Sequence, residues 1–135
     1  MAMKARSRWI EGFRSVLDNG RRHSVVVDLP ENLGGADTGP TALELAVMAL
    51  AGCITTIFSM VAKKMRLEFE GAEAVVEAEK GEATIEKCTI TLKVKTKEPK
   101  ERVERAWELT WKTCPVGILF ARAGVEVEHR VEVVE

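Results

Sequence analysis

Apolar and polar residues alternate along most of this chain, with one long apolar run near its middle. The alternation is clearest in residues 84–95, whose apolar side consists of Cys88, Ile90, Leu92 and Val94. A period of two residues is typical of a strand with one buried face. The same pattern over shorter lengths predicts further strands at Met3–Ile10, Gly12–Leu17, Arg22–Asp28, Ala72–Glu79 and Val125–Val134.

Two turn sequences connect these strands into hairpins. Asp18-Asn19-Gly20 follows the second strand, and an Asn-Gly pair tolerates the positive φ angles of a tight turn. Lys80-Gly81 is a second turn sequence, between the strand expected at Ala72–Glu79 and residues 84–95. We therefore expect one hairpin near the start of the chain and another after the apolar run.

The apolar run Leu45–Ala62 predicts a long helix from Thr41 to about Arg66. Thr41 can cap its first turn, and Glu44 stands three residues later, as in a capping box. Eighteen uncharged residues also meet the minimal length of a membrane span. We favour a buried helix of a soluble protein, because Gly, Thr and Ser interrupt the run and amphipathic strands surround it. No membrane partner is expected.

A second helix is expected at Pro99–Lys112, with Trp107 and Trp111 on its apolar face. Pro115 interrupts this helix and fits better as the first residue of a new short helix, which Gly124 would end. The order of elements is strands, helix, hairpin, helices and strand, which is typical of an α+β fold. A length of 135 residues suits a single domain, residues 1–135.

Composition narrows the functional classes. A formal net charge of −1 lacks the basic character of nucleic-acid binders, so no nucleic-acid partner is expected. Charged residues make up 30% of the chain and Gln is absent, which resembles thermophile composition. No secretory signal pattern is visible, and we expect a cytoplasmic location.

Three widely spaced cysteines do not resemble the disulfide framework of a secreted protein. With Pro115 as first helical residue, Cys114 is the helix N-cap, where amides and the helix dipole lower a thiol pKa. The alternative is that Cys114 only packs beneath the tryptophans. Cys53 lies in the middle of the apolar helix, where a thiol is inert unless a cation or hydrogen-bond donor reaches it. Cys88 is interpreted as a small core residue.

Other kinds of site lack support in the sequence. His23 and His129 have no Cys or His neighbour at metal-ligand spacing, so no metal is expected. There is no P-loop, GxSxG or GxGxxG motif, and we expect no cofactor.

The sequence motifs together resemble the OsmC/Ohr family of thiol-dependent hydroperoxide reductases. Residues 39–45, running into Ala49–Cys53, resemble the helix that carries the first cysteine of this family. Residues 113–116, Thr-Cys-Pro-Val, resemble the motif of its second cysteine, and residues 8–12 look like its branch near YhfA. The resemblance implies an OsmC-like fold, with antiparallel sheets around a long central buried helix, in an intertwined homodimer.

The resemblance also implies a chemistry. Cys53 would attack an organic hydroperoxide as a thiolate and become a sulfenic acid, and Cys114 would condense with it to a disulfide. A dithiol reductant would then reset the pair. For the apolar substrate we expect contacts from Phe58, Trp107 and Trp111.

The activating residues of the family are matched less closely. Characterised members carry a Glu ten residues before the first cysteine, where this chain has Leu43, and Glu44 follows. One position turns a helix by about 100°. The activating Arg aligns best with Arg14, which we expect Glu44 to orient. Other arginines remain alternatives: Arg8, Arg21 and Arg22.

Two functions therefore remain open. The retained cysteine pair favours the two-cysteine peroxidase. The shifted Glu44 favours a non-enzymatic module, which senses redox state or binds a small apolar ligand near Trp107 and Trp111.

Overall fold

The computed structural model describes residues 1–135 and confirms the α+β class. The chain forms two compact units, Met1–Ala46 and Val47–Glu135. All of the strands and helices expected from the sequence are present, with boundaries shifted by a few residues. The prediction of a single domain stays a prediction.

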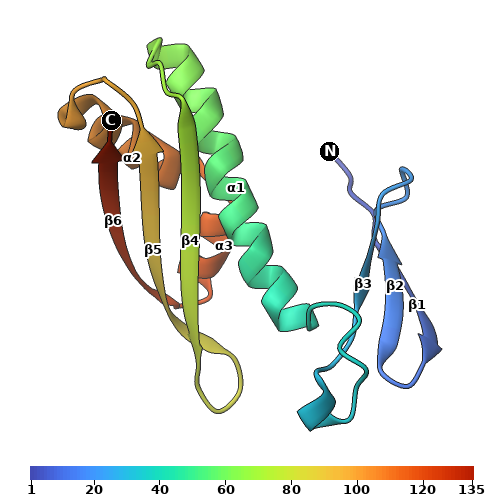
Figure 1. The fold of residues 1–135 in the computed structure, drawn as a ribbon. Coiled ribbons are helices and arrows are strands. Elements are labelled where there is room, and N and C mark those ends of the chain that lie inside the picture. Colours follow the sequence, from blue (N-terminus) through green and yellow to red (C-terminus); the bar gives the residue numbers. More distant parts are fainter. The chain divides into compact units, whose positions relative to one another are not determined.

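The first unit is a three-stranded antiparallel sheet of β1 (Arg6–Glu11), β2 (Arg14–Asp18) and β3 (Ser24–Val27), in that order (Figure 1). The predicted hairpin joins β2 to β3. Its turn is longer than an Asn-Gly pair alone, because the Asn19 N–H donates to the His23 carbonyl at 3.3 Å. A short 3₁₀ helix, η1 (Glu31–Leu33), follows β3.

Large apolar side chains of the first unit lie on its surface. Trp9 is 69% exposed, Phe13 55% and Ile10 49%. All six residues of β1 are exposed. Exposed apolar groups gathered in this way are typical of a surface that another molecule covers.

Helix α1 (Ala42–Met65) starts with the predicted capping box. The Thr41 N–H donates to Glu44 Oε1 at 2.9 Å, and the Glu44 N–H donates to Thr41 Oγ1 at 3.0 Å. These bonds satisfy amides that no helical carbonyl reaches. The carboxylate of Glu44 therefore has a structural task at the helix start.

In the single chain α1 is buried along one side, and the expectation that a dimer buries its other faces stays a prediction. Its buried residues are spaced by four and form one stripe: Leu50, Ile54, Phe58 and Ala62. Met48 and Met60, outside the stripe, are 54% and 53% exposed. The helix is long and apolar enough to span a membrane, and 22% of its most apolar 18-residue window is buried. The apolar sequence of α1 does not indicate which molecule covers the faces of the helix outside this stripe.

The second unit contains a sheet in the order β4 (Gly71–Lys80), β5 (Ile85–Lys95), β6 (Glu126–Val134) (Figure 1). β4 and β5 form the predicted antiparallel hairpin, but β6 runs parallel to β5. The prediction of antiparallel sheets is wrong for this pair. Helices α2 (Lys100–Thr113) and α3 (Pro115–Arg122) return the chain to the end where β5 began, and such a crossover produces a parallel neighbour.

One face of this sheet carries the core and the other faces water. The side chains of Cys88, Ile90, Leu92 and Val94 on β5 are fully buried. They lie in a core with the buried stripe of α1 and with the apolar face of α2. The opposite face carries charged pairs such as Lys87 and Glu128, 3.5 Å apart. The sheet and its helices therefore form a rigid support for residues at the helix junctions.

Candidate functional site: two thiols at a helix junction

Cys53 and Cys114 are neighbours, although they are 61 residues apart in the sequence. Their sulfur atoms lie 3.0 Å apart, at hydrogen-bond distance, and both are free thiols. Cys53 is half-buried on α1, while Cys114 is fully buried between α2 and α3. A disulfide requires about 2.05 Å between the sulfurs. The pair is thus placed to form one with a small movement.

Cys114 occupies the N-cap position of α3, as expected. Pro115 is the first residue of that helix, and the Gly117 N–H donates to Cys114 Sγ at 3.4 Å. Gly124, at φ +84°, follows the other end. The sequence signals the Gly117 contact through the N-cap position of Cys114. An N-cap side chain accepts a hydrogen bond from the amide three residues later, which here is the amide of Gly117.

The pKa of the Cys114 thiol is shifted upward, whereas the N-cap position had led us to expect a lowered pKa. Burial, followed by the hydrogen bond with Cys53, raises the pKa of Cys114 to about 11, despite the opposing contributions of the Gly117 and Val116 amides. Removal of water outweighs the helix N-terminus. Cys114 therefore carries its proton at neutral pH. Burial also raises the pKa of Cys88, which lies on β5 apart from the pair.

Gly117 has a second task, in packing. A Cβ atom at this position would lie 2.7 Å from Cζ3 of Trp111, closer than two carbon atoms approach. The absent side chain allows the indole of Trp111 to lie directly on the first turn of α3. This contact fixes the turn that presents an amide to Cys114.

The aromatic residues expected to bind substrate lie mainly in the core. Phe58 is fully buried and meets Phe69 edge-on, with ring centroids 5.4 Å apart. Trp107 is 3% exposed, and its Nε1–H donates to His129 Nδ1 at 3.0 Å. Trp111 is half-buried and stacks on Trp107 at 5.9 Å. In this conformation a substrate does not reach Phe58, and the tryptophans support α2 and α3.

Arg14 and Glu44 belong to the first unit, where they have different partners. Arg14 donates from Nε to Thr38 Oγ1 at 3.0 Å and from Nη1 to Glu11 Oε1 at 3.1 Å. Glu44 accepts from the Thr41 amide. The structure thus orients Arg14 through Thr38 and Glu11, where we expected Glu44.

Asp28 extends the hydrogen-bond network of Arg14 and Thr38 into the interior of the first unit. It is 3% exposed and accepts from Thr38 Oγ1 at 2.6 Å and from the Thr38 N–H at 3.1 Å. These bonds, with the hydroxyl of Thr38 first, lower the pKa of Asp28 to about 2. The hydroxyl hydrogen is therefore directed at Asp28, and the oxygen remains free to accept from Arg14. The sequence analysis missed both Asp28 and Thr38, since no motif links them.

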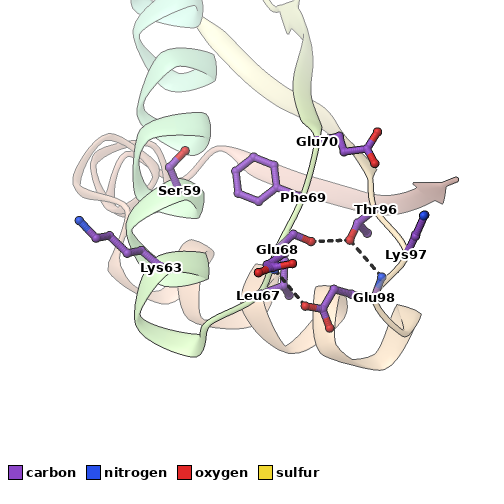
Figure 2. A pocket seen from close by; sticks show the side chains of 9 residues that line it. All are labelled: Ser59, Lys63, Leu67, Glu68, Phe69, Glu70, Thr96, Lys97 and Glu98. Atoms are coloured by element: carbon purple, nitrogen blue, oxygen red, sulfur yellow. Dashed lines mark hydrogen bonds between the residues drawn. The ribbon is translucent and has the colours of Figure 1, made fainter.

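Two pockets of the second unit are close enough to α1 to bear on the site. The larger, about 640 Å³, is at the end of α1, between Lys63 and Thr96 (Figure 2). Three of its polar residues are bonded to one another, because the Glu68 N–H donates to Glu98 and the Thr96 hydroxyl donates to the Glu68 carbonyl. It contains no cysteine. This pocket therefore offers no reactive thiol.

The second pocket, about 370 Å³, follows α1 and α2 and is mainly apolar. We call it the α1–α2 groove, and its lining is Ile57, Met60, Val61, Lys64, Met65, Leu109 and Thr113. Ile57 is one helical turn beyond Cys53, and Thr113 directly precedes Cys114. Each cysteine thus has a neighbour on its own helix or at its helix junction that lines the groove.

Comparison with known families agrees with this arrangement. The family model described as OsmC-like protein matches residues 34–130. The chain belongs to the OsmC-like family. The matched region contains both members of the thiol pair and the whole of α1. Comparison with curated proteins gives no significant match.

Solved structures show the same OsmC-like fold over the full chain. An OsmC-like protein from Mycoplasma pneumoniae has a TM-score of 0.89 at 11% identity, with 100% of this chain and 99% of that chain covered. An organic hydroperoxide resistance protein OsmC from Legionella pneumophila has a TM-score of 0.73 at 17% identity, covering 98% of each chain. The organic hydroperoxide resistance protein OhrB of Bacillus subtilis has a TM-score of 0.66 at 21% identity, also covering 98% of each. At such identities the likeness concerns the fold.

Proposed function

We propose that this protein is a thiol-dependent peroxidase that reduces organic hydroperoxides through Cys53 and Cys114. The observation that carries the proposal is the 3.0 Å contact between a half-buried and a fully buried thiol. Membership of the OsmC-like family supports it, and so do the names of the Legionella and Bacillus proteins. We also infer kinship with the branch near YhfA, on the basis of residues 8–12.

The proposed cycle assigns one role to each thiol. Cys53 is the more exposed, so its thiolate attacks the outer oxygen of the hydroperoxide, the O–O bond breaks, and an alcohol leaves. The resulting sulfenic acid condenses with Cys114 and releases water. An external dithiol then reduces the disulfide by exchange.

The α1–α2 groove is the proposed place for the organic part of the substrate. Its lining is apolar apart from Lys64 and Thr113, and it includes Ile57, one helical turn beyond Cys53, and Thr113, the residue before Cys114. An apolar pocket favours an alkyl or aryl hydroperoxide over hydrogen peroxide. The groove replaces Phe58 and Trp107, which the core encloses, as the expected substrate contact.

Consumption of cumene hydroperoxide by the purified protein tests this function. With dithiothreitol present, we expect continuous loss of peroxide far above the rate without protein. After one equivalent of peroxide and no reductant, peptide mapping should show a disulfide between Cys53 and Cys114. Peroxide loss at the background rate, or a disulfide that includes Cys88, would contradict the proposal.

Arg14 is the proposed source of positive charge for the Cys53 thiolate. With Arg14→Ala, the pH midpoint of Cys53 alkylation should rise by about one unit, the usual effect of losing a close opposite charge. The measurement is the rate of iodoacetamide labelling against pH. Arg6→Ala, at an exposed arginine on β1 of the same sheet, is the matched control. An unchanged midpoint in Arg14→Ala would reject Arg14.

A homodimer is the proposed partner for the exposed apolar surfaces. These surfaces lie on β1 and on the open faces of α1, where Trp9 and Met48 are more than half exposed. Burial of such groups is the main source of association free energy. Sedimentation at micromolar concentration should give twice the 14.9 kDa of one chain. A 14.9 kDa species, or extraction with the membrane fraction, would count against the dimer.

The second candidate is a redox sensor or apolar ligand-binding module. The capping role of Glu44 favours it, because this carboxylate has a structural partner. A module that binds an apolar ligand without turnover would consume no peroxide above the background rate when dithiothreitol is present. Continuous peroxide consumption therefore separates the two candidates.

A further inference from the structure

The reduced thiol pair presents a difficulty that the simple cycle leaves open. Peroxide attack needs a thiolate at Cys53, and disulfide formation then needs Cys114 to lose its proton. Cys114 is fully buried, and its thiol pKa is raised to about 11. Yet the two sulfurs are already 3.0 Å apart before any oxidation. The contact therefore exists at a stage where a purely resolving cysteine has no task.

The surroundings determine which sulfur donates. Cys114 Sγ already accepts the Gly117 N–H, so its own hydrogen is free to point at Cys53. Negative charge is better solvated on Cys53, which is half-buried, than on Cys114, which has no exposed surface. The geometry thus favours an S–H donor at Cys114 and a thiolate at Cys53.

Charged side chains on the neighbouring elements do not replace this donor. On α1, Lys63 is ten residues beyond Cys53, about 15 Å along the helix. On α2 and α3 the nearest charges in sequence, Lys112 and Arg122, are exposed. His129 on β6 accepts from Trp107. Within this unit, Cys114 is the donor in direct contact with Cys53.

We propose that Cys114 acts before the disulfide forms, as hydrogen-bond donor to the Cys53 thiolate and as proton donor to the leaving alkoxide. This inference rests on the proposed peroxidase function. It makes Cys114 a general acid in the first step as well as the resolving thiol in the second.

The two steps balance without another reactant. The Cys53 thiolate forms an S–O bond with the outer peroxide oxygen, and the O–O electron pair leaves with the alkoxide. The alkoxide takes the Cys114 proton, which gives an alcohol, a sulfenic acid and a Cys114 thiolate. That thiolate attacks the Cys53 sulfur, so the S–S bond forms, the S–O bond breaks, and hydroxide leaves. The hydroxide takes from solvent the proton that Cys53 released on ionising, which gives water.

Relative basicity makes the proton transfer favourable. An alkoxide is about as basic as hydroxide and therefore far more basic than a thiolate. The pKa of Cys114, about 11, is lower than that of an alcohol, so its proton moves downhill to the alkoxide. The substrate held at Cys53 itself thus removes the proton that blocks the resolving step.

Cys114→Ala and Cys114→Ser separate this role from disulfide formation, since neither variant can form the disulfide. The measurement is the initial rate of dimedone-trapped sulfenic acid at Cys53 with cumene hydroperoxide. Cys114→Ala should slow this rate by about a hundredfold, the lower end of the usual range for loss of a general acid. Cys114→Ser keeps an O–H hydrogen-bond donor to the Cys53 thiolate but no proton as acidic as that of a thiol, so its rate should lie between those of the wild type and Cys114→Ala. Cys88→Ala, at the other buried thiol, is the control for general effects.

A second readout does not need peroxidase activity. The pH midpoint of Cys53 alkylation should rise by about one unit in Cys114→Ala and by clearly less in Cys114→Ser. Equal midpoints in all three proteins, or equal sulfenic acid rates, would overturn the inference even where the wild type consumes peroxide. If the wild type forms no sulfenic acid, the proton-transfer step and the peroxidase function both fail, and the alkylation shift alone supports the hydrogen bond.

Discussion

Cys53→Ser should abolish thiol-dependent consumption of cumene hydroperoxide. We expect a rate at least about a thousandfold lower than that of the wild type, the scale of effect seen when a covalent nucleophile is removed. A serine hydroxyl stays protonated at neutral pH and does not attack an O–O bond. Because Cys53 is half-buried and serine has nearly the same shape, stability should change by no more than about 1 kcal/mol. Peroxide remaining after fixed times, with dithiothreitol in excess, gives the rate.

The same substitution at Cys88 is the matched control. Cys88 is fully buried on β5 and outside the thiol pair, so Cys88→Ser should lower stability and leave the rate per folded molecule unchanged. Substantial activity in Cys53→Ser would show that another group attacks the peroxide. Equal losses in both variants would trace the effect to folding.

Phe58→Ala should lower the free energy of unfolding by about 3–5 kcal/mol, which is a large part of the stability of a small domain. Phe58 is fully buried at the centre of the α1 stripe and meets the ring of Phe69 edge-on. The truncation removes apolar burial and leaves a cavity, because the closely packed neighbouring residues cannot move enough to fill the space of the missing ring. The loss should therefore approach the upper part of the range.

Urea unfolding at one fixed protein concentration measures this loss. Met60→Ala, two residues along the same helix and 53% exposed, is the comparison. It should cost less than about 1 kcal/mol within one chain. A cost at Met60 that depends on protein concentration would report the proposed dimer, whereas the cost at Phe58 should not depend on concentration. A loss below about 1 kcal/mol at Phe58 would show that its side chain is not part of the core.

The periodic parts of the fold could be predicted because side-chain alternation marks a buried face directly. β5 shows this well, since Ile90 and Leu92 are buried as its pattern indicates. The direction of β6 could not be predicted in this way, because its own residues alternate equally in a parallel or an antiparallel pair. Which molecule buries the exposed faces of α1 also could not be predicted. An apolar residue such as Met60 is stabilised equally by burial against its own chain or against a second chain.

In the candidate site, too, local features could be predicted and long-range ones could not. The N-cap position of Cys114 is a local feature, and Pro115 reveals it. Its thiol pKa depends on burial by elements distant in the sequence, and there the prediction was wrong. The contact of Arg14 with Thr38 spans 24 residues and rests on a buried Asp28, and no local pattern encodes such a network.

The parallel pairing of β5 with β6 sets the order in which this unit can assemble. β6 reaches β5 only after the residues from 96 to 125 have closed a long loop, an entropic cost that comes before its contacts form. Long-range pairing of this kind is slow compared with hairpin formation. Cys114 lies within that loop, so its encounter with Cys53 is a late event in folding. A chain that meets oxidant before the loop closes carries three independent thiols, any two of which can pair.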